Sequence, residues 1–225
     1  MYTYAFFKTP LQPLQLTEGI AGDLAVIKTD TLSALVEPDL EFEEIQNDDT
    51  QLVQAVLTHD RVICDLFWQV TILPLRFGTK FLSYDRLVDH LIENREKYLG
   101  KLNQLEGKAE YRLKLTPIEL ELPASPEMNG SMKGRDYFQA KKQQYQAHID
   151  QKDQQQEELQ QILSEIEQVY PNTKLKEGAD GIEKLYLLID KREEMTLYQH
   201  LNEWQNQYPH WELGLGEALP PYHFV

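Results

Sequence analysis

Residues 136–169 constrain the fold of this chain more than any other stretch. The segment holds eleven glutamines between Gln139 and Gln168, and residues 150–158 contain no apolar side chain. A single straight helix of this length would run roughly 50 Å, which is longer than a hundred-residue domain is wide. We therefore expect two or three successive helices, with a polar middle that forms an exposed extension and an end at residues 159–169 that packs on a core.

A coiled-coil partner site is the functional alternative for this segment. Apolar residues do mark both of its ends, but they do not continue as heptads. A coiled coil needs such repeats along its whole seam. We therefore favour the exposed extension.

The first 108 residues predict an N-terminal α+β domain. Strands are expected at residues 2–8, 24–28 and 31–36, where β-branched and aromatic residues gather, and the last two form a hairpin. Asp49 is expected to cap a first helix, and Ser83 a second one that Gly107 ends. With one strand between these helices, the order is β-β-β-α-β-α, a helix-covered small sheet.

The helix after Asp49 has an apolar side with residues at three- and four-residue spacing. Its members are Leu52, Val53, Val56, Leu57, Ile63, Leu66 and Phe67. Cys64 lies on the same side. A catalytic thiolate would need a stabilising neighbour, and only His59 and Asp60 are near in sequence, so we favour a structural cysteine.

A strand and a tight turn follow this helix. The turn segment consists of Leu73, Pro74, Leu75, Arg76, Phe77, Gly78 and Thr79. Its proline and glycine, with one arginine between apolar residues, indicate a strand that ends in a turn and a buried guanidinium that needs partners. Arg76 could bind an anion, but we favour a salt bridge or carbonyl contacts that stabilise the turn.

Residues 109–215 predict a second domain of the modified ferredoxin-like type. Strands are expected at residues 110–122, 173–176, 184–190 and 211–215, and helices at residues 136–169 and 197–208, in the order β-α-β-β-α-β. The helical extension is thus inserted in the first crossover. Residues 130–135 lack P-loop spacing, so we favour a loop over a phosphate cradle there.

Residues 216–225 form an apolar tail with four notable positions. These are Pro220, Pro221, Tyr222 and Phe224. Apolar surface is costly to leave in water, at roughly 25 cal/mol per Å². We expect the tail to dock in a groove between the two domains.

The charge excludes several kinds of partner. The chain has 37 acidic and 22 basic residues and a net charge of −15, which opposes binding to nucleic acid and to anionic lipid membranes. It has no apolar run long enough for a membrane span. Its first residues show a strand pattern, whereas a signal sequence would begin with a charged region. A single cysteine, Cys64, suits a reducing cytosol.

Acidic residues cluster between residues 37 and 49, and no Lys or Arg occurs from Thr29 to Asp60. This cluster is either a docking surface for a basic partner or a solvated loop, and we favour the loop. The six histidines lack paired ligand spacing, and there is no cysteine cluster. We expect no catalytic residue, no metal and no cofactor, and therefore no enzyme.

Several of these segments together resemble the gas vesicle protein F and L family (GvpF/GvpL), and most of all its F members. The likeness lies in residues 59–63, in the turn segment, in Tyr98-Leu99 and Glu110-Tyr111, and in Pro220-Pro221-Tyr222 with Phe224. The resemblance implies a structural or assembly role in gas vesicles, with no catalytic motif. It also implies a location at the vesicle shell, within the cytoplasm.

Two functional hypotheses follow from the resemblance. In the first, the protein is a minor structural component that is required for vesicle formation and binds the main gas vesicle shell protein, beside other gas vesicle accessory proteins. In the second, it is a soluble assembly factor that prevents aggregation of the shell protein. It is not the wall itself, because a gas-holding wall needs a continuous apolar inner face. A two-domain chain with a net charge of −15 cannot supply such a face.

Overall fold

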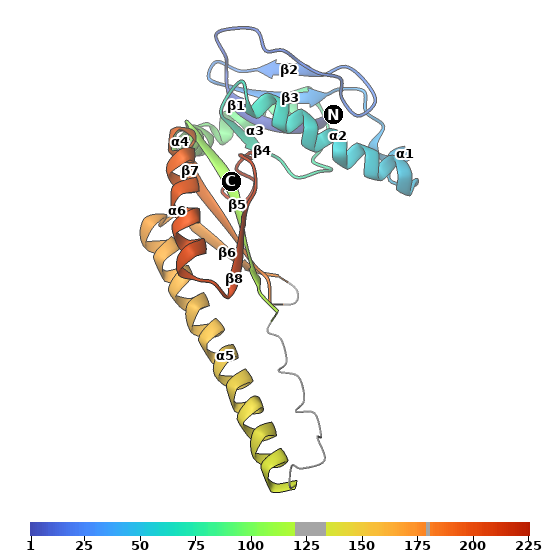
Figure 1. The fold of residues 1–225 in the computed structure, drawn as a ribbon. Coiled ribbons are helices and arrows are strands. Elements are labelled where there is room, and N and C mark those ends of the chain that lie inside the picture. Colours follow the sequence, from blue (N-terminus) through green and yellow to red (C-terminus); the bar gives the residue numbers. More distant parts are fainter. Residues whose placement is uncertain (120–133, 179–180) are drawn as a thin grey trace. The chain divides into compact units, whose positions relative to one another are not determined.

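A computed structural model describes residues 1–119, 134–178 and 181–225 (Figure 1). The chain forms two compact units. The first consists of Met1–Glu110, Leu188–Lys191 and Ala218–Val225, and the second of Tyr111–Leu187 and Arg192–Glu217. Each unit has a four-stranded sheet with helices, so the predicted α+β class with two sheets is confirmed.

Two expectations lie partly outside the described residues. They concern the end of the strand expected at residues 110–122 and the loop expected at residues 130–135. Gly181 is described and has a φ of 72°, the left-handed conformation that a tight turn requires.

The first sheet has the order β2-β3-β1-β4 and is antiparallel between all neighbours. Its strands are β1 (Tyr2–Lys8), β2 (Ala25–Lys28), β3 (Leu32–Glu37) and β4 (Ile72–Pro74). The β2-β3 hairpin was predicted from sequence and is confirmed. β1 lies between β3 and β4, so the strand at the start of the chain becomes a central one.

Four helices belong to the first unit: α1 (Phe42–Ile45), α2 (Asp49–Phe67), α3 (Tyr84–Glu93) and α4 (Arg95–Leu105). The cap of α2 is Asp48, whose Oδ1 accepts from the amides of Thr50 and Gln51, so the prediction of Asp49 was wrong by one residue. Ser83 caps α3 as predicted, but Asn94 then divides the expected single helix into α3 and α4.

Helices cover both faces of the first sheet. Leu87 and Leu91 of α3 and Leu102 of α4 join the core cluster that includes Phe6 of β1. On the other face, the ring of His59 in α2 stacks on Tyr4 with 5.2 Å between centroids. β1 and β3 are therefore buried at nearly every position.

The second sheet has the order β6-β7-β5-β8. It contains β5 (Lys108–Pro117), β6 (Thr173–Glu177), β7 (Glu183–Asp190) and β8 (Trp211–Leu215), with helices α5 (Gly134–Val169) and α6 (Glu194–Gln207) and the short 3-10 helix η1 (Lys191–Glu193). The chain order β-α-β-β-α-β is the ferredoxin-like order expected from sequence.

Residues 134–169 form one continuous helix, α5, so the expectation of two or three successive helices was wrong. The first buried side chain along it, among those described, is that of Glu158. Leu159, Ile162 and Ile166 then pack in the core at three- and four-residue spacing. The helix can stay straight because only its last third needs an apolar partner, while its polar part runs on into solvent (Figure 1).

Polar contacts attach α5 where its buried part begins. The Gln155 side-chain amide donates to the carbonyls of Ile118 and His210, and the Trp211 indole N–H donates to the Gln155 carbonyl at 2.9 Å. Farther along, the Tyr208 hydroxyl donates to Glu165 at 2.7 Å. These contacts hold the buried third of α5 in one register against the rest of its unit.

Candidate functional site

The turn segment is held by hydrogen bonds within itself and to β1. The carbonyl of Arg76 accepts from the amide of Thr79 at 3.1 Å and from its hydroxyl at 2.6 Å. Gly78 has a φ of 86°, which explains the glycine. The Leu75 amide donates to the Tyr4 carbonyl, so the turn continues directly from the β1-β4 pairing.

His59 of α2 stabilises this turn through hydrogen bonds. Its Nε2–H donates to the carbonyl of Leu75 at 3.2 Å, and its Nδ1 accepts from the Tyr2 hydroxyl at 2.9 Å. The same hydroxyl oxygen accepts from the Gly78 amide at 3.2 Å. A neutral histidine satisfies every group in this chain of bonds, and burial lowers the pKa of His59, which favours that neutral form.

A buried carboxylate completes the network on β3. Glu37 is 2% exposed and accepts from the Tyr4 hydroxyl at 2.5 Å and from the amides of Ile20 and Ala21. Burial raises the pKa of Tyr4, and that of Tyr2 to about 12, so both hydroxyls remain donors. A Cβ on Gly19 would collide with the Glu37 carboxylate, which explains why the loop there contains glycine. Sequence inspection missed this network because its members are far apart in the chain.

The tail is attached to the first unit by specific polar contacts. Glu110 is 1% exposed, and its carboxylate accepts from the amide of His223 at 2.8 Å and from its Nδ1 at 2.7 Å. The Tyr222 hydroxyl donates to Asp60 at 2.5 Å, and Phe224 packs against the core cluster. Pro220 and Pro221 are buried. Docking between the two domains stays a prediction.

Cys64 lies 4.0 Å from the hydroxyl of Tyr222. Burial raises the pKa of its thiol, and the neighbouring Asp60 carboxylate acts in the same direction. A nucleophilic cysteine requires the opposite shift. The surroundings of Cys64 are therefore those of a structural cysteine.

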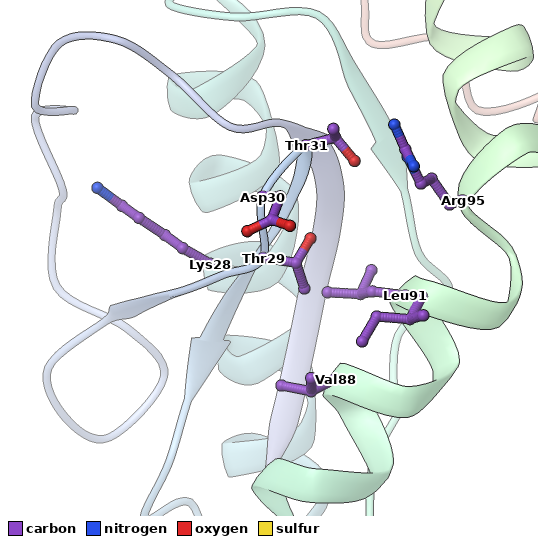
Figure 2. Close-up of a pocket in the computed structure, with 8 residues that line it drawn as sticks. Lys28, Thr29, Asp30, Thr31, Val88, Leu91 and Arg95 are labelled. Carbon is purple, nitrogen blue, oxygen red and sulfur yellow. The ribbon is translucent and has the colours of Figure 1, made fainter.

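A pocket of about 390 Å³ lies between the β2-β3 turn and α3 (Figure 2). Thr29, Asp30 and Thr31 face Val88 and Leu91 across it. The hydroxyl of Thr29 already donates to the Leu32 carbonyl, and its own carbonyl accepts from Thr9. The polar groups of the turn thus stabilise the hairpin, and the pocket is a groove with a mixed lining.

A second pocket, of about 340 Å³, adjoins the turn segment itself. It is lined by Phe6, Leu73, Pro74, Leu75, Arg76, Thr79, Lys97, Tyr98, Lys101 and Val225. The prediction that Arg76 is buried was wrong: the residue is exposed, and no hydrogen bond or ion pair of its guanidinium occurs among the described residues. The turn is held by the Arg76 carbonyl, so its side chain remains available at the pocket.

The outer side of α2 carries exposed apolar residues. Val53, Val56 and Leu57 are 57%, 43% and 60% exposed, although the sequence pattern placed them on the core-facing side. The buried face of α2 consists instead of Ala55, His59, Val62, Ile63, Leu66 and Phe67. The apolar pattern did not identify the buried face, because two of its core positions are a histidine and an alanine. The three exposed residues form a separate stripe between Asp49 and Asp60.

Neither a metal-ligand cluster nor a membrane-spanning helix occurs in the part of the chain that the structure describes. No group of three or more His, Cys, Asp or Glu side chains in that part of the chain is placed to hold a metal ion. No helix there is both long enough and apolar enough to cross a membrane.

These features define a class: a mixed α+β protein with two four-stranded sheets and an ordered turn and tail in its first unit. All of residues 1–225 match the family described as gas vesicle synthesis protein GvpL/GvpF. The chain belongs to this family, as the motifs in its sequence indicated. Its role therefore concerns gas vesicles.

Solved structures show the same fold. The crystal structure of the gas vesicle protein GvpF from Anabaena sp. PCC7120 matches with a TM-score of 0.69 at 16% identity, over 99% of this chain and 94% of that one. GvpF from Microcystis aeruginosa matches with a TM-score of 0.67 at 16% identity, over 99% and 97%. No curated protein sequence matches.

Proposed function

We propose that the protein is a minor structural component of the gas vesicle, required for its formation, and that it binds the main shell protein through the outer side of α2. The observation that carries this proposal is the exposed stripe of Val53, Val56 and Leu57. An apolar stripe on the exposed side of a helix is a surface that a partner can cover. Membership of the gas vesicle family supports a vesicle protein as that partner.

The charge around the stripe favours a partner segment that is both basic and apolar. Asp48, Asp49 and Asp60 are exposed beside it, and Glu44 is exposed on α1, where Glu43 pairs with Lys80. Acidic residues at the rim of an apolar contact steer a basic segment and reject an acidic one. The acidic cluster that the sequence suggested as a solvated loop thus acquires a binding role in this proposal.

The proposal assigns the protein a binding function and no catalytic one. The raised pKa of the Cys64 thiol supports this, because it leaves the single cysteine as a poor nucleophile. A shell-associated location follows from the same contact with the shell protein.

The alternative is a soluble assembly factor that shields the shell protein before polymerisation. The same exposed stripe favours it, because a chaperone needs an accessible apolar surface. Cell fractionation separates the two functions: intact vesicles are floated, washed in urea and blotted for this protein. Recovery with washed vesicles is expected, and recovery in the soluble fraction alone would reject the structural role in favour of the assembly factor.

The stripe itself is tested by the triple variant Val53→Ser, Val56→Ser and Leu57→Ser. We expect it to fold, because all three side chains are exposed, and to lose copurification of the shell protein and with it vesicle formation. A matched control replaces Leu11, Leu82 and Ile92 by serine, three exposed apolar residues of the same unit. Equal loss in both triple variants, or in neither, would contradict a specific role of α2.

A further inference from the structure

The pocket beside Arg76 has an apolar base with fixed walls. Phe6 and Leu73 at its base are 2% and 5% exposed and belong to the core. Tyr98 forms a wall, and its hydroxyl is engaged with Nε2 of His90 at 2.7 Å. The cavity of about 340 Å³ therefore exists without rearrangement of the core and offers space for apolar side chains.

Three cations stand around this apolar base: Arg76, Lys97 and Lys101. Lys97 lies over the ring of Tyr98 at 6.0 Å, and Lys101 donates one hydrogen bond to the Phe224 carbonyl at 3.3 Å. Among the described residues, none of the three forms an ion pair with a carboxylate. No Asp or Glu side chain lines the pocket; Val225 in its lining carries the terminal carboxylate, which forms no ion pair with these cations among the described residues.

The positive charge of this pocket lining is opposite in sign to the net charge of the chain. The chain has 37 acidic and 22 basic residues, yet the charged side chains that line this pocket are three cations. A guanidinium fork matches a carboxylate bidentately, and ammonium groups add further charge-assisted hydrogen bonds. The geometry thus points to an anionic ligand that also brings apolar surface.

We propose that this pocket binds a peptide segment of a partner protein in which a carboxylate side chain lies next to an apolar one. The carboxylate pairs with Arg76, with Lys97 and Lys101 beside it, and the apolar side chain enters the space above Phe6 and Leu73. A small inorganic anion would leave that apolar space unfilled. An anionic lipid surface would be repelled by the net charge of −15.

This site is distinct from the stripe on α2. None of Val53, Val56 and Leu57 lines it, and it selects an acidic segment where the stripe favours a basic one. The proposal therefore does not rest on the proposed function, and either can fail alone.

The test uses the full chain and fluorescein-labelled octapeptides with blocked ends. Each peptide carries one Glu flanked by Leu, Ile or Phe, and each has a twin with Gln in place of Glu. Fluorescence anisotropy should show that at least one Glu peptide binds about tenfold more tightly than its twin, a difference of ~1.4 kcal/mol. Higher salt should weaken the binding, because the contacts are ionic.

Arg76→Gln should weaken this binding about tenfold, whereas Arg86→Gln, an equal charge change at an exposed arginine of α3, should leave it unchanged within about twofold. Lys97→Gln, which lies outside the turn segment, is the second variant and should also weaken the peptide binding. The proposal is overturned if Glu and Gln peptides bind alike, if no peptide binds, or if Arg76→Gln and Lys97→Gln bind like the wild type. Binding to phosphatidylserine vesicles alone would overturn it in favour of a lipid site.

Discussion

The two sheets of this protein differ in how they are buried. In β1 the six residues from Tyr2 to Phe7 are all buried, whereas in β7 buried residues alternate with partly exposed ones. Helices cover both faces of the first sheet, so every side chain of its central strands meets a neighbour. Where one face carries the core, as in β7, the pleat places every second residue away from it.

This difference decides where polar groups are buried. In the first unit Glu37 and His59 lie between the sheet and α2, and each is held by hydrogen bonds from several segments. In the second unit Glu158, the buried acid of α5, pairs with His210 near the end of the sheet. The hydrogen bonds of Glu37 and His59 offset their burial, because an unpaired charged or ring group there would be strongly destabilising.

The sharpest test of the comparison substitutes neighbouring residues in each sheet. Phe6→Ala and Phe7→Ala should each destabilise the first unit by about 3–5 kcal/mol, because both side chains are buried. In β5, Leu113→Ala should cost about 2–5 kcal/mol and the adjacent Lys114→Ala less than about 0.5 kcal/mol. Hydrogen exchange of β1 and β5 peptides in increasing urea measures each unit separately. A small effect at Phe6 or at Phe7 would show that one face of β1 is open.

The next effect concerns pH and the His59 network. Burial lowers the folded-state pKa of His59 below its unfolded value of about 6.5, so the unfolded chain binds the proton more readily. The stability that the neutral ring contributes is fully present above about pH 6.5 and is lost as the pH falls through the folded pKa. Urea unfolding of the first unit at pH 8 and pH 5.5 should show this loss.

His59→Gln should flatten that pH dependence and cost about 1–2 kcal/mol at pH 8, where its hydrogen bonds are partly replaced. His200→Gln, in the second unit, serves as the control and should leave the pH dependence of the first unit as in the wild type. An unchanged slope in His59→Gln would mean that another group titrates.

The smallest effect is expected on the polar part of α5. Gln146 is exposed, and its side-chain amide donates to Asp150 at 2.9 Å. Gln146→Ala should therefore change the stability of the second unit by less than about 0.5 kcal/mol. Leu159→Ala, in the buried part of the same helix, should cost about 2–5 kcal/mol in the same hydrogen-exchange experiment. A similar loss of stability in the two variants would show that α5 packs against other residues along its whole length.

Much of the fold could be predicted from local patterns. The strand at Tyr2–Lys8, the cap at Ser83, the left-handed Gly107 and the strand at Trp211–Leu215 all depend on residues near each other in the chain. The continuous α5 was not predicted, because chain length alone suggested a bend, whereas the helix extends past the surface that it covers.

The candidate site was predicted only in part. The turn segment and the tail were singled out, but the partners that hold them, His59 for the turn and Glu110 for the tail, were not. The pattern also placed Val53, Val56 and Leu57 in the core, because hydrophobic spacing does not distinguish the two faces of a helix that carries apolar residues on both.

The sequence by itself determined most of the strands, the α+β class and the family, since each of these depends on patterns within short windows. Tertiary structure alone decided which face of α2 is buried, where Arg76 points and which distant groups satisfy Glu37 and His59. The physical reason is that burial and hydrogen-bond partners depend on contacts between residues far apart in the chain, which no local pattern records.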